Sequence, residues 1–330
     1  MLITAADNLY PHKTAVILNP YSGQVRRRLD SIRQLSACIP GVTIHEAGSL
    51  TDLDQIVSEV KLQERDHLVV IGGDGTVQAV LNRLLSGPEW RSFPLLSIVP
   101  GGTTNMTATD IGSCGRAEKN LQRLVSSLQS ASGVNLITRP VLHIQQDNQT
   151  DVYGMFFGAG IIARGARFFH KHIKKSGLLG ESASALVMLH LLTGLLSGRN
   201  SEEFQASHIR LQDDNRLVWE QRSLLMFAST LDRLLLGMRP YWGAGQGQIH
   251  TTILRDKAVH FWRALPKILC RKGGLLTVEN GYYSRNNTTL ELLMDEDYIV
   301  DGEFFHCDSQ NGPLRISATR PIKFLVAHAP

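Results

Sequence analysis

The sequence predicts an α/β domain with a doubly wound parallel sheet, followed by a domain of mainly antiparallel β-strands. Short apolar runs alternate with amphipathic segments over the first third of the chain. The pattern changes near Gly133 to period-2 strands separated by turns rich in Asn, Asp and Gly. A chain of 330 residues is long enough for two cores. We expect the α/β domain over residues 1–134 plus a C-terminal segment at about 319–330, and a β-sandwich domain over residues 135–318.

The elements of the first domain follow from the spacing of apolar residues. Short strands are predicted at residues 14–19, 42–46, 67–71 and 95–99, the first of them continuously apolar. Their alternation with helical segments predicts a parallel sheet. Helical spacing predicts helices at residues 24–38, 51–61 and 76–85. Thr51 is the candidate N-cap of the second of these helices.

The second domain contains eight strand-like segments and two helical stretches. The strands are predicted at residues 136–145, 151–158, 208–212, 223–229, 249–254, 274–278, 288–293 and 298–304. The helical stretches are predicted at about residues 161–197 and 257–270, and Pro266 is expected to kink or end the latter. A final strand at residues 321–326 is expected to return to the first domain.

Composition excludes several classes of protein. The chain is 43% hydrophobic and 19% charged, which excludes a disordered chain. Its net charge of +4 is too small to indicate a nucleic-acid-binding protein. The longest apolar run, residues 183–196, is shorter than a membrane-spanning helix requires. The four cysteines, Cys38, Cys114, Cys270 and Cys307, are far apart in sequence and indicate a reduced, cytoplasmic protein.

The most informative motif is Ile71-Gly72-Gly73-Asp74-Gly75-Thr76, which follows a predicted strand and opens a helix. Glycines allow the backbone to approach a ligand closely, and free N–H groups at a helix N-terminus favour phosphate. Asp74 fits such a site if a divalent cation bridges its carboxylate to the phosphates. A tight strand-to-helix turn without a ligand is the alternative.

Two further loops favour the phosphate interpretation. Pro100-Gly101-Gly102-Thr103-Thr104-Asn105 follows the strand at residues 95–99, and Asn19-Pro20-Tyr21-Ser22-Gly23 ends the first strand. Loops at the carboxyl ends of neighbouring parallel strands form one crevice, the usual ligand position in open α/β sheets. Neither a Walker A loop nor a Rossmann fingerprint is present.

In this order and spacing, NP-x-SG, GGDGT and PGGTTN resemble the diacylglycerol kinase catalytic-domain family, which includes bacterial lipid kinases and sphingosine kinases. Gly237-Met238-Arg239-Pro240 and Val300-Asp301-Gly302-Glu303 resemble the family's later proline and DGE segments. The resemblance implies a fold shared with NAD kinases and an ATP- and Mg²⁺-dependent lipid kinase. Such an enzyme transfers the γ-phosphoryl group of ATP to a hydroxyl of a diacylglycerol-like or sphingoid lipid between the two domains.

The resemblance also implies roles for individual residues. Asp74 would lie near Mg²⁺, and Glu303 would be the catalytic general base for the lipid hydroxyl. The nucleotide-binding residues would be Asn19, Ser22, Gly72, Gly73, Asp74, Gly75, Thr76, Gly102 and Thr103. Taken without the family, Asp301-Gly302-Glu303 is typical of a β-hairpin turn.

Two positions depart from the family pattern. Met106 replaces an expected Asp, and Gly245-Gln246-Gly247 occupies the region of an acidic turn linked to a structural Mg²⁺. The chain therefore binds metal differently, phosphorylates a different or soluble alcohol, or has become a nucleotide- or lipid-binding regulator without activity. The sequence leaves these alternatives open.

Two basic segments are candidates for contact with a lipid membrane. Basic and apolar side chains mix in residues 167–180, where the basic segment is 167–175, and in residues 260–272. This mixture is typical either of membrane-surface contact or of a solvated helix. We expect a cytoplasmic protein without a transmembrane segment, peripheral at the inner face of the membrane, with a lipid acceptor and no nucleic-acid partner. A homodimer is compatible with the sequence.

Overall fold

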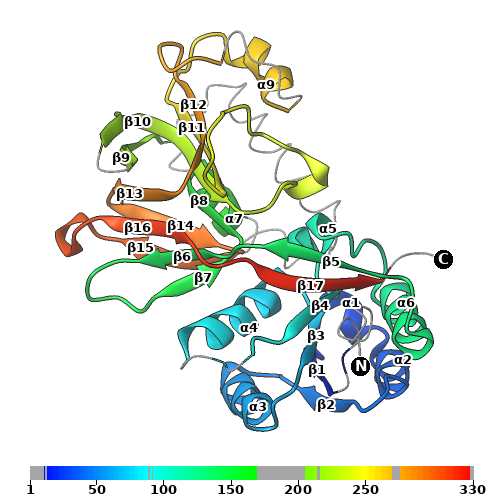
Figure 1. Ribbon diagram of the computed structural model, residues 1–330. Helices are drawn as coiled ribbons and strands as arrows, with labels where there is room; N and C mark the ends of the chain where they lie inside the picture. The colour runs from blue at the N-terminus through cyan, green and yellow to red at the C-terminus, as the bar shows by residue number, and fades with distance from the viewer. Residues whose placement is uncertain are drawn as a thin grey trace, which may run out of the picture. The chain divides into compact units, whose positions relative to one another are not determined.

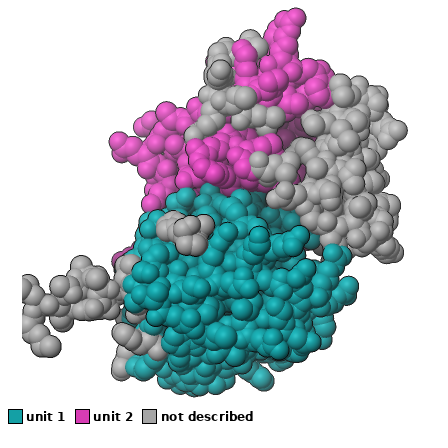
Figure 2. All heavy atoms as spheres, turned by 90° about the vertical axis from the view of Figure 1, so that its right-hand side faces the viewer, with its two compact units in different colours: residues 1–139, 321–330 teal, residues 140–320 magenta. Residues whose placement is uncertain are grey.

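The computed structural model describes residue 11 and residues 13–87, 90, 92–168, 205–213, 216–269 and 276–327. The chain divides into two compact units, residues 1–139 with 321–330 and residues 140–320 (Figure 2). The apolar run at residues 183–196, the lysines of the basic segment 167–175, and Cys270 lie outside the described residues. Within the described ranges, no helix combines the length and the apolar character needed to cross a bilayer.

The first unit is built on a six-stranded sheet with the order β2-β1-β3-β4-β17-β5 (Figure 1). β1 to β4 run parallel to one another, and β17 is parallel to β4 and antiparallel to β5. The strands are β1 Thr14–Leu18, β2 Thr43–Glu46, β3 His67–Gly72, β4 Leu95–Pro100, β5 Val134–Arg139 and β17 Ile322–Ala327. Every residue of β1 and β3 is buried, as expected for central strands covered on both faces.

Helices of the first unit, as far as its residues are described, cover both faces of this sheet. In Figure 1, α3 and α4 lie on one face, and α1, α2 and α6 lie on the other. The helices are α1 Gly23–Arg26, α2 Leu29–Ala37, α3 Leu50–Leu62, α4 Asp74–Ser86, α5 Met106–Asp110 and α6 Ala117–Ser130. Leu121 and Leu124 of α6 share a core with Ile32 of α2 and Val69 of β3, so the amphipathic pattern explains the packing.

Two predictions in this unit are wrong in detail. The helix expected at residues 24–38 is divided into α1 and α2, because Arg28 leaves the helical region at φ −141° and ψ 30°. The apolar spacing continues through this break and does not reveal it. The N-cap of α3 is Ser49 instead of Thr51, since Ser49 and Asp52 form a reciprocal capping box.

A chain of polar side chains crosses the interior of the first sheet. Thr14 of β1 contacts Nδ1 of His67 on β3 at 3.2 Å, and Nε2 of His67 contacts Oγ of Ser97 on β4 at 2.9 Å. Ser97 in turn donates to the backbone oxygen of Leu325 on β17 at 2.7 Å. Four adjacent strands are therefore linked by buried hydrogen bonds between side chains and backbone.

The second unit is built on an 11-stranded antiparallel sheet with the order β15-β14-β8-β10-β9-β13-β16-β6-β7, in which β11 pairs with β10 and β12. The strands are β6 Leu142–Gln145, β7 Val152–Gly154, β8 Phe156–Gly160, β9 Ser207–Asp213, β10 Arg216–Ser229, β11 Ile249–Arg255, β12 Tyr282–Asn287, β13 Thr289–Leu293, β14 Glu296–Val300, β15 Glu303–Cys307 and β16 Leu314–Ala318. The described helices are α7 Ile161–Phe168 and α9 Phe261–Leu269.

This sheet curls, and its two ends meet over one core. A Cβ on Gly154 of β7 would lie 2.3 Å from Val300 of β14, although six strands lie between these two in the sheet order. Side chains from β6, β8, β10, β13 and β14 share a single core cluster that contains Trp219 and Tyr298. The predicted fold class, a parallel α/β sheet followed by an antiparallel β structure, is confirmed.

Several sequence-based boundaries in the second part of the chain need correction. The strand expected at residues 151–158 is divided into β7 and β8. The strand expected at residues 136–145 is divided at Pro140 into β5 and β6, which belong to different units. The strand expected at residues 274–278 is wrong for residues 276–278, which are not in a strand. The strands β12 and β16 were missed. The segment expected at residues 298–304 is the hairpin of β14 and β15. Pro266 does not end α9, which continues to Leu269.

Candidate functional site

Three loops leave the carboxyl ends of the adjacent strands β1, β3 and β4. We call residues 19–23 the first loop, residues 72–76 the second loop and residues 100–105 the third loop. β1 lies between β2 and β3, so the chain proceeds to opposite sides of β1, and this is a topological switch point. Open α/β sheets bind ligands outside the carboxyl ends of their strands at such a point. All residues that the sequence assigns to nucleotide binding lie in these three loops.

The second loop turns directly from β3 into α4. Gly73 is the N-cap of α4, and Asp74, Gly75 and Thr76 form its first turn. A Cβ on Gly72 would lie 2.6 Å from the Cβ of Thr76, so the turn is too tight for a side chain there. The first N–H groups of an α-helix have no partner within the helix. This loop therefore presents backbone donors at the positive end of the α4 dipole.

The third loop packs on the second loop through glycine backbones. Gly101 donates to the carbonyl of Gly72 at 2.7 Å. A Cβ on Gly102 would lie 2.4 Å from the Cα of Gly73. The glycines were expected to allow approach of a ligand, and the structure gives them a second reason, because they allow the two loops to touch.

Asp74 connects the second loop to the start of α5. One carboxylate oxygen of Asp74 accepts hydrogen bonds from the Thr104 hydroxyl at 2.6 Å and from the Met106 N–H at 3.1 Å. The other oxygen accepts from the Thr107 N–H at 3.2 Å. Asp74 thus acts as a cap for α5 from a different part of the chain. Met106 contributes its backbone N–H to this network, and that contact is independent of its side chain.

The first loop is joined to the second by Asn19, and Gln24, the residue after the first loop, bonds to the third loop. Nδ2 of Asn19 donates to Oγ1 of Thr76 at 2.9 Å, and its Oδ1 accepts from the N–H of Tyr21. Ser22 is the half-buried N-cap of α1. Gln24 donates from its backbone to Gly101 and from its side chain to Gly102. Hydrogen bonds therefore join the three loops through Asn19, Gly72, Asp74, Thr76 and Gly102. The other predicted residues, Ser22, Gly73, Gly75 and Thr103, lie in the same loops.

Sequence reasoning missed three contributors to this assembly. Gln24 carries no motif that could have identified it. Thr104 and Asn105 follow Thr103 directly, and their position in the loop was a usable signal. Asn105 adopts a left-handed conformation with φ 47°, and its side chain closes the third loop by bonding the N–H and the carbonyl of Gly102.

Glu303 lies in the second unit, at the exposed start of β15. Asp301 and Gly302 have φ values of 49° and 96°, and two positive φ values in sequence define a type I′ hairpin turn. The hairpin interpretation of this motif is confirmed. Asp301 is 6% exposed, and its two carboxylate oxygens accept from the N–H groups of Met155 at 2.8 Å and Phe156 at 2.9 Å. Asp301 therefore holds this turn, which carries Glu303, against the neighbouring segment at Met155 and Phe156.

The region of Gln246 is built from closely packed backbone. A Cβ on Gly243, Gly245 or Gly247 would lie within 2.3 Å of a backbone atom of β12 or its adjoining residue. Gln246 itself is exposed. Within the described ranges, no group of three His, Cys, Asp or Glu side chains is arranged to hold a metal ion.

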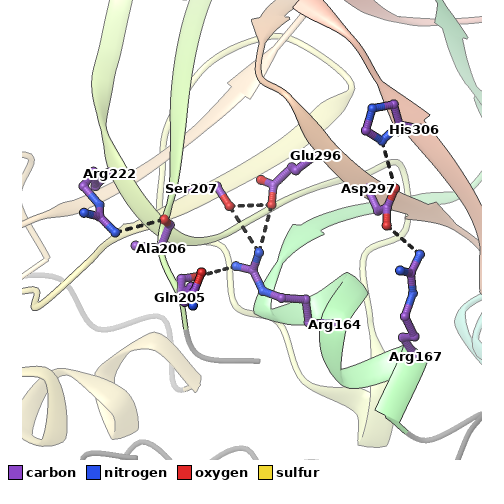
Figure 3. Close-up of polar contacts among 9 residues, drawn as sticks. All are labelled: Arg164, Arg167, Gln205, Ala206, Ser207, Arg222, Glu296, Asp297 and His306. Carbon is purple, nitrogen blue, oxygen red and sulfur yellow. Dashed lines mark hydrogen bonds and ion pairs between the residues drawn. The ribbon is translucent and has the colours of Figure 1, made fainter. Parts of the chain in front are cut away.

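A charged cluster fixes α7 on the second unit (Figure 3). Arg164 of α7 binds the Glu296 carboxylate and the Ser207 hydroxyl at 3.2 Å each, and also the backbone oxygen of Gln205. Burial raises the pKa of the Glu296 carboxyl, which is only 9% exposed, and hydrogen bonds from Ser207 and Arg164 oppose this. Arg167 pairs with Asp297. Of the basic segment expected at residues 167–175, Arg167 is thus a structural contact.

Part of the chain is similar in sequence to known proteins. Residues 13–135 match the family model of the diacylglycerol kinase catalytic domain. A curated relative from Streptococcus pneumoniae serotype 4, described as a "putative lipid kinase", is 34% identical over 99 residues. That alignment covers 28% of this chain and 32% of the relative, so it spans about a third of the relative's length.

Two solved structures from Bacillus anthracis str. Sterne share the fold. One is described as a diacylglycerol kinase, with 16% identity, a TM-score of 0.62, and coverage of 96% of this chain and 97% of that one. The other, described as a "putative diacylglycerol kinase", has 17% identity, a TM-score of 0.67 and the same coverage. The family resemblance of the sequence is confirmed over residues 13–135.

Proposed function

We propose that this chain, whose residues 13–135 match the diacylglycerol kinase catalytic domain, is an ATP-dependent lipid kinase. The observation that carries the proposal is the assembly of three loops at the switch point of the first sheet. Its second loop opens the 13-residue helix α4 with a Gly-Asp-Gly-Thr turn. Backbone donors and a helix dipole at a switch point are suited to the phosphates of a nucleotide.

The residues present fit a magnesium ion, and Asp74 is the residue that would hold it. Mg²⁺ in phosphoryl-transfer sites is commonly held by one or two carboxylates together with substrate phosphates. Asp74 supplies one carboxylate, whose three hydrogen bonds leave part of its acceptor capacity for a cation. When bound, the ion would neutralise charge on the transferred phosphoryl group. The chain's own contribution is to orient Asp74 through Thr104 and the first N–H groups of α5.

The acceptor hydroxyl would be deprotonated by Glu303. An exposed carboxylate at the start of a strand is accessible to substrate, and a carboxylate is a suitable general base for an alcohol. The type I′ turn and Asp301 hold the backbone beside Glu303 in one conformation. The lipid character of the acceptor is supported by the relative from Streptococcus pneumoniae, which is described as a "putative lipid kinase".

The direct test uses labelled ATP, Mg²⁺ and a total lipid extract, with identification of any labelled product. We expect a phosphorylated lipid with the wild-type chain. Asp74→Asn and Glu303→Gln should each lower turnover by at least about a hundredfold, the usual scale for a lost general base or charge-stabilising group. Glu118→Gln on α6 serves as a carboxylate control. Wild-type turnover in both Asp74→Asn and Glu303→Gln would show that the site is assigned wrongly.

Two rival functions are motivated by Met106 and Gln246. A nucleotide- or lipid-binding regulator would bind ATP without turnover on any lipid. A kinase of a soluble alcohol would show activity that is indifferent to vesicles or micelles. Binding of ATP measured by calorimetry, run beside the lipid assay, separates these two cases from the lipid kinase.

A further inference from the structure

The helix α9 lies at one end of the second unit, beyond β11 and β12 (Figure 1). Its inner face is fully used in packing, because Ala264 is 0% and Ile268 is 5% exposed. These side chains share a small core with Leu254 of β11 and Tyr282 of β12. The inner face of α9 is therefore packed against β11 and β12, and its outer face points away from this small core.

The outer face carries large apolar side chains. Trp262 is 43% exposed, and Val259, just before the helix, is 40% exposed. Val278, which is 42% exposed, belongs to a turn that is tied to this region by a 2.9 Å hydrogen bond from the Val259 N–H to the carbonyl of Asn280. Three exposed apolar side chains thus lie on neighbouring segments of one surface.

The same surface is basic. Residues 257–269 contain Lys257, Arg263 and Lys267 and no Asp or Glu, although the net charge of the entire chain is only +4. Lys257 and Arg263 are exposed and Lys267 is half-buried, and none of the three is ion-paired with another described residue. The acidic groups close by in sequence are Asp256 and Glu279. The helix therefore concentrates positive charge beside its exposed tryptophan.

We propose that this α9 surface, formed by Lys257, Val259, Trp262, Arg263, Lys267 and Val278, docks the protein on an anionic phospholipid bilayer. Tryptophan is suited to the boundary between headgroups and acyl chains, and basic side chains are attracted to anionic headgroups. The two valines favour a bilayer over a nucleic acid, since a phosphate backbone offers them no apolar surface. The proposal goes beyond the proposed function, and its test requires no catalysis.

The test is co-sedimentation of the full chain with vesicles of phosphatidylcholine alone or with 30% phosphatidylglycerol, without ATP. We expect tighter binding to the anionic vesicles, weakened by salt. Arg263→Gln/Lys267→Gln should weaken binding roughly fivefold for each charge removed, and Trp262→Ala about tenfold. The matched controls, Arg116→Gln/Lys119→Gln on α6 and Leu62→Ala on α3, remove exposed charges and an exposed leucine elsewhere and should bind like the wild type.

A second readout locates the contact. Brominated lipid in the anionic vesicles should quench part of the tryptophan fluorescence of the wild type, and Trp262→Phe should remove that quenching. Equal affinity of Arg263→Gln/Lys267→Gln and wild type for the anionic vesicles would overturn the proposal. So would absence of vesicle binding, equal binding to both kinds of vesicle, or tighter binding to an RNA oligonucleotide than to vesicles.

Discussion

Gly102 and Gly73 show how single residues determine the geometry of the three loops. The space between them accepts a hydrogen atom and no carbon, since a Cβ on Gly102 would lie 2.4 Å from the Cα of Gly73. We predict that Gly102→Ala destabilises the protein by about 1–3 kcal/mol through overpacking and weakens nucleotide binding. Denaturant unfolding and ATP calorimetry measure the two effects. Gly87→Ala at the end of α4 is the control, because its nearest contact is an ordinary 3.4 Å and its φ is −85°.

Asp301 is the second residue whose role is readable from its contacts. Its buried carboxylate accepts one backbone N–H group on each oxygen. In Asn an NH2 donor replaces one of these oxygens and cannot accept the second N–H. We predict that Asp301→Asn lowers kcat about tenfold and leaves the KM for ATP unchanged, because the turn that presents Glu303 is loosened while the loops of the first unit are untouched. Steady-state kinetics at saturating lipid gives both constants.

A double-mutant cycle separates positioning of Glu303 from general destabilisation. If Asp301 acts through Glu303, Asp301→Asn should cost little further activity in a Glu303→Gln background. Full additivity of the two substitutions would contradict this role. Circular dichroism of each variant establishes that the second unit is folded before the comparison is made.

At the scale of elements, β1, β3, β4 and β17 are joined by the buried polar chain through His67. The hydroxyl of Ser97 donates to Leu325, so its oxygen accepts from Nε2–H of His67, and the unprotonated Nδ1 faces Thr14. The ring is 0% exposed, and burial lowers the pKa of His67 from 6.5 to about 4. The folded protein therefore holds a neutral imidazole under conditions in which the unfolded chain binds a proton.

This difference predicts acid sensitivity of the first sheet. Because the folded pKa is depressed, the unfolded state binds more protons between pH 6.5 and about 4, so stability falls as the pH is lowered through this window. The loss from His67 alone is about 3 kcal/mol. Denaturant unfolding at pH 7 and pH 4 should show a smaller difference for His67→Asn than for wild type. The exposed His208→Gln should retain the wild-type difference, and an unchanged His67→Asn difference would refute the assignment.

Elements differ in how far their sequences predict them. The strands β1, β3 and β4 and the loops after them were predictable, because a short apolar run followed by glycines is a local pattern. The contact of Asp74 with the start of α5 was not predictable, since it joins residues that local spacing does not relate. The break between α1 and α2 was hidden because apolar spacing continues through it. Both the contact of Asp74 with α5 and the break between α1 and α2 are determined by tertiary packing, which local sequence patterns do not contain.

At the scale of the whole molecule, the first unit is completed by the end of the described chain. β17 lies between β4 and β5, and all residues of the second unit are inserted between β5 and β17. The first sheet is therefore complete only when β17 pairs with β4 and β5, which are far from it in the sequence. Contacts of such long sequence separation are slow to form. Phe324 and Leu325 of β17, at 0% and 1% exposure, carry the apolar contribution of this strand.

This arrangement predicts that a lesion in β17 loosens the first unit selectively. Phe324→Ala should cost about 3–5 kcal/mol, as other large-to-small core substitutions do. Because each unit has its own core, amide hydrogen exchange should accelerate by about 10² or more in β1, β3 and β4 and change far less in β9 and β10. The neighbouring Lys323→Ala, on the exposed side of the same strand, should leave both sheets unchanged. Equal acceleration in both sheets would mean that the two units unfold together, which would contradict the prediction that each unit has its own free energy of unfolding.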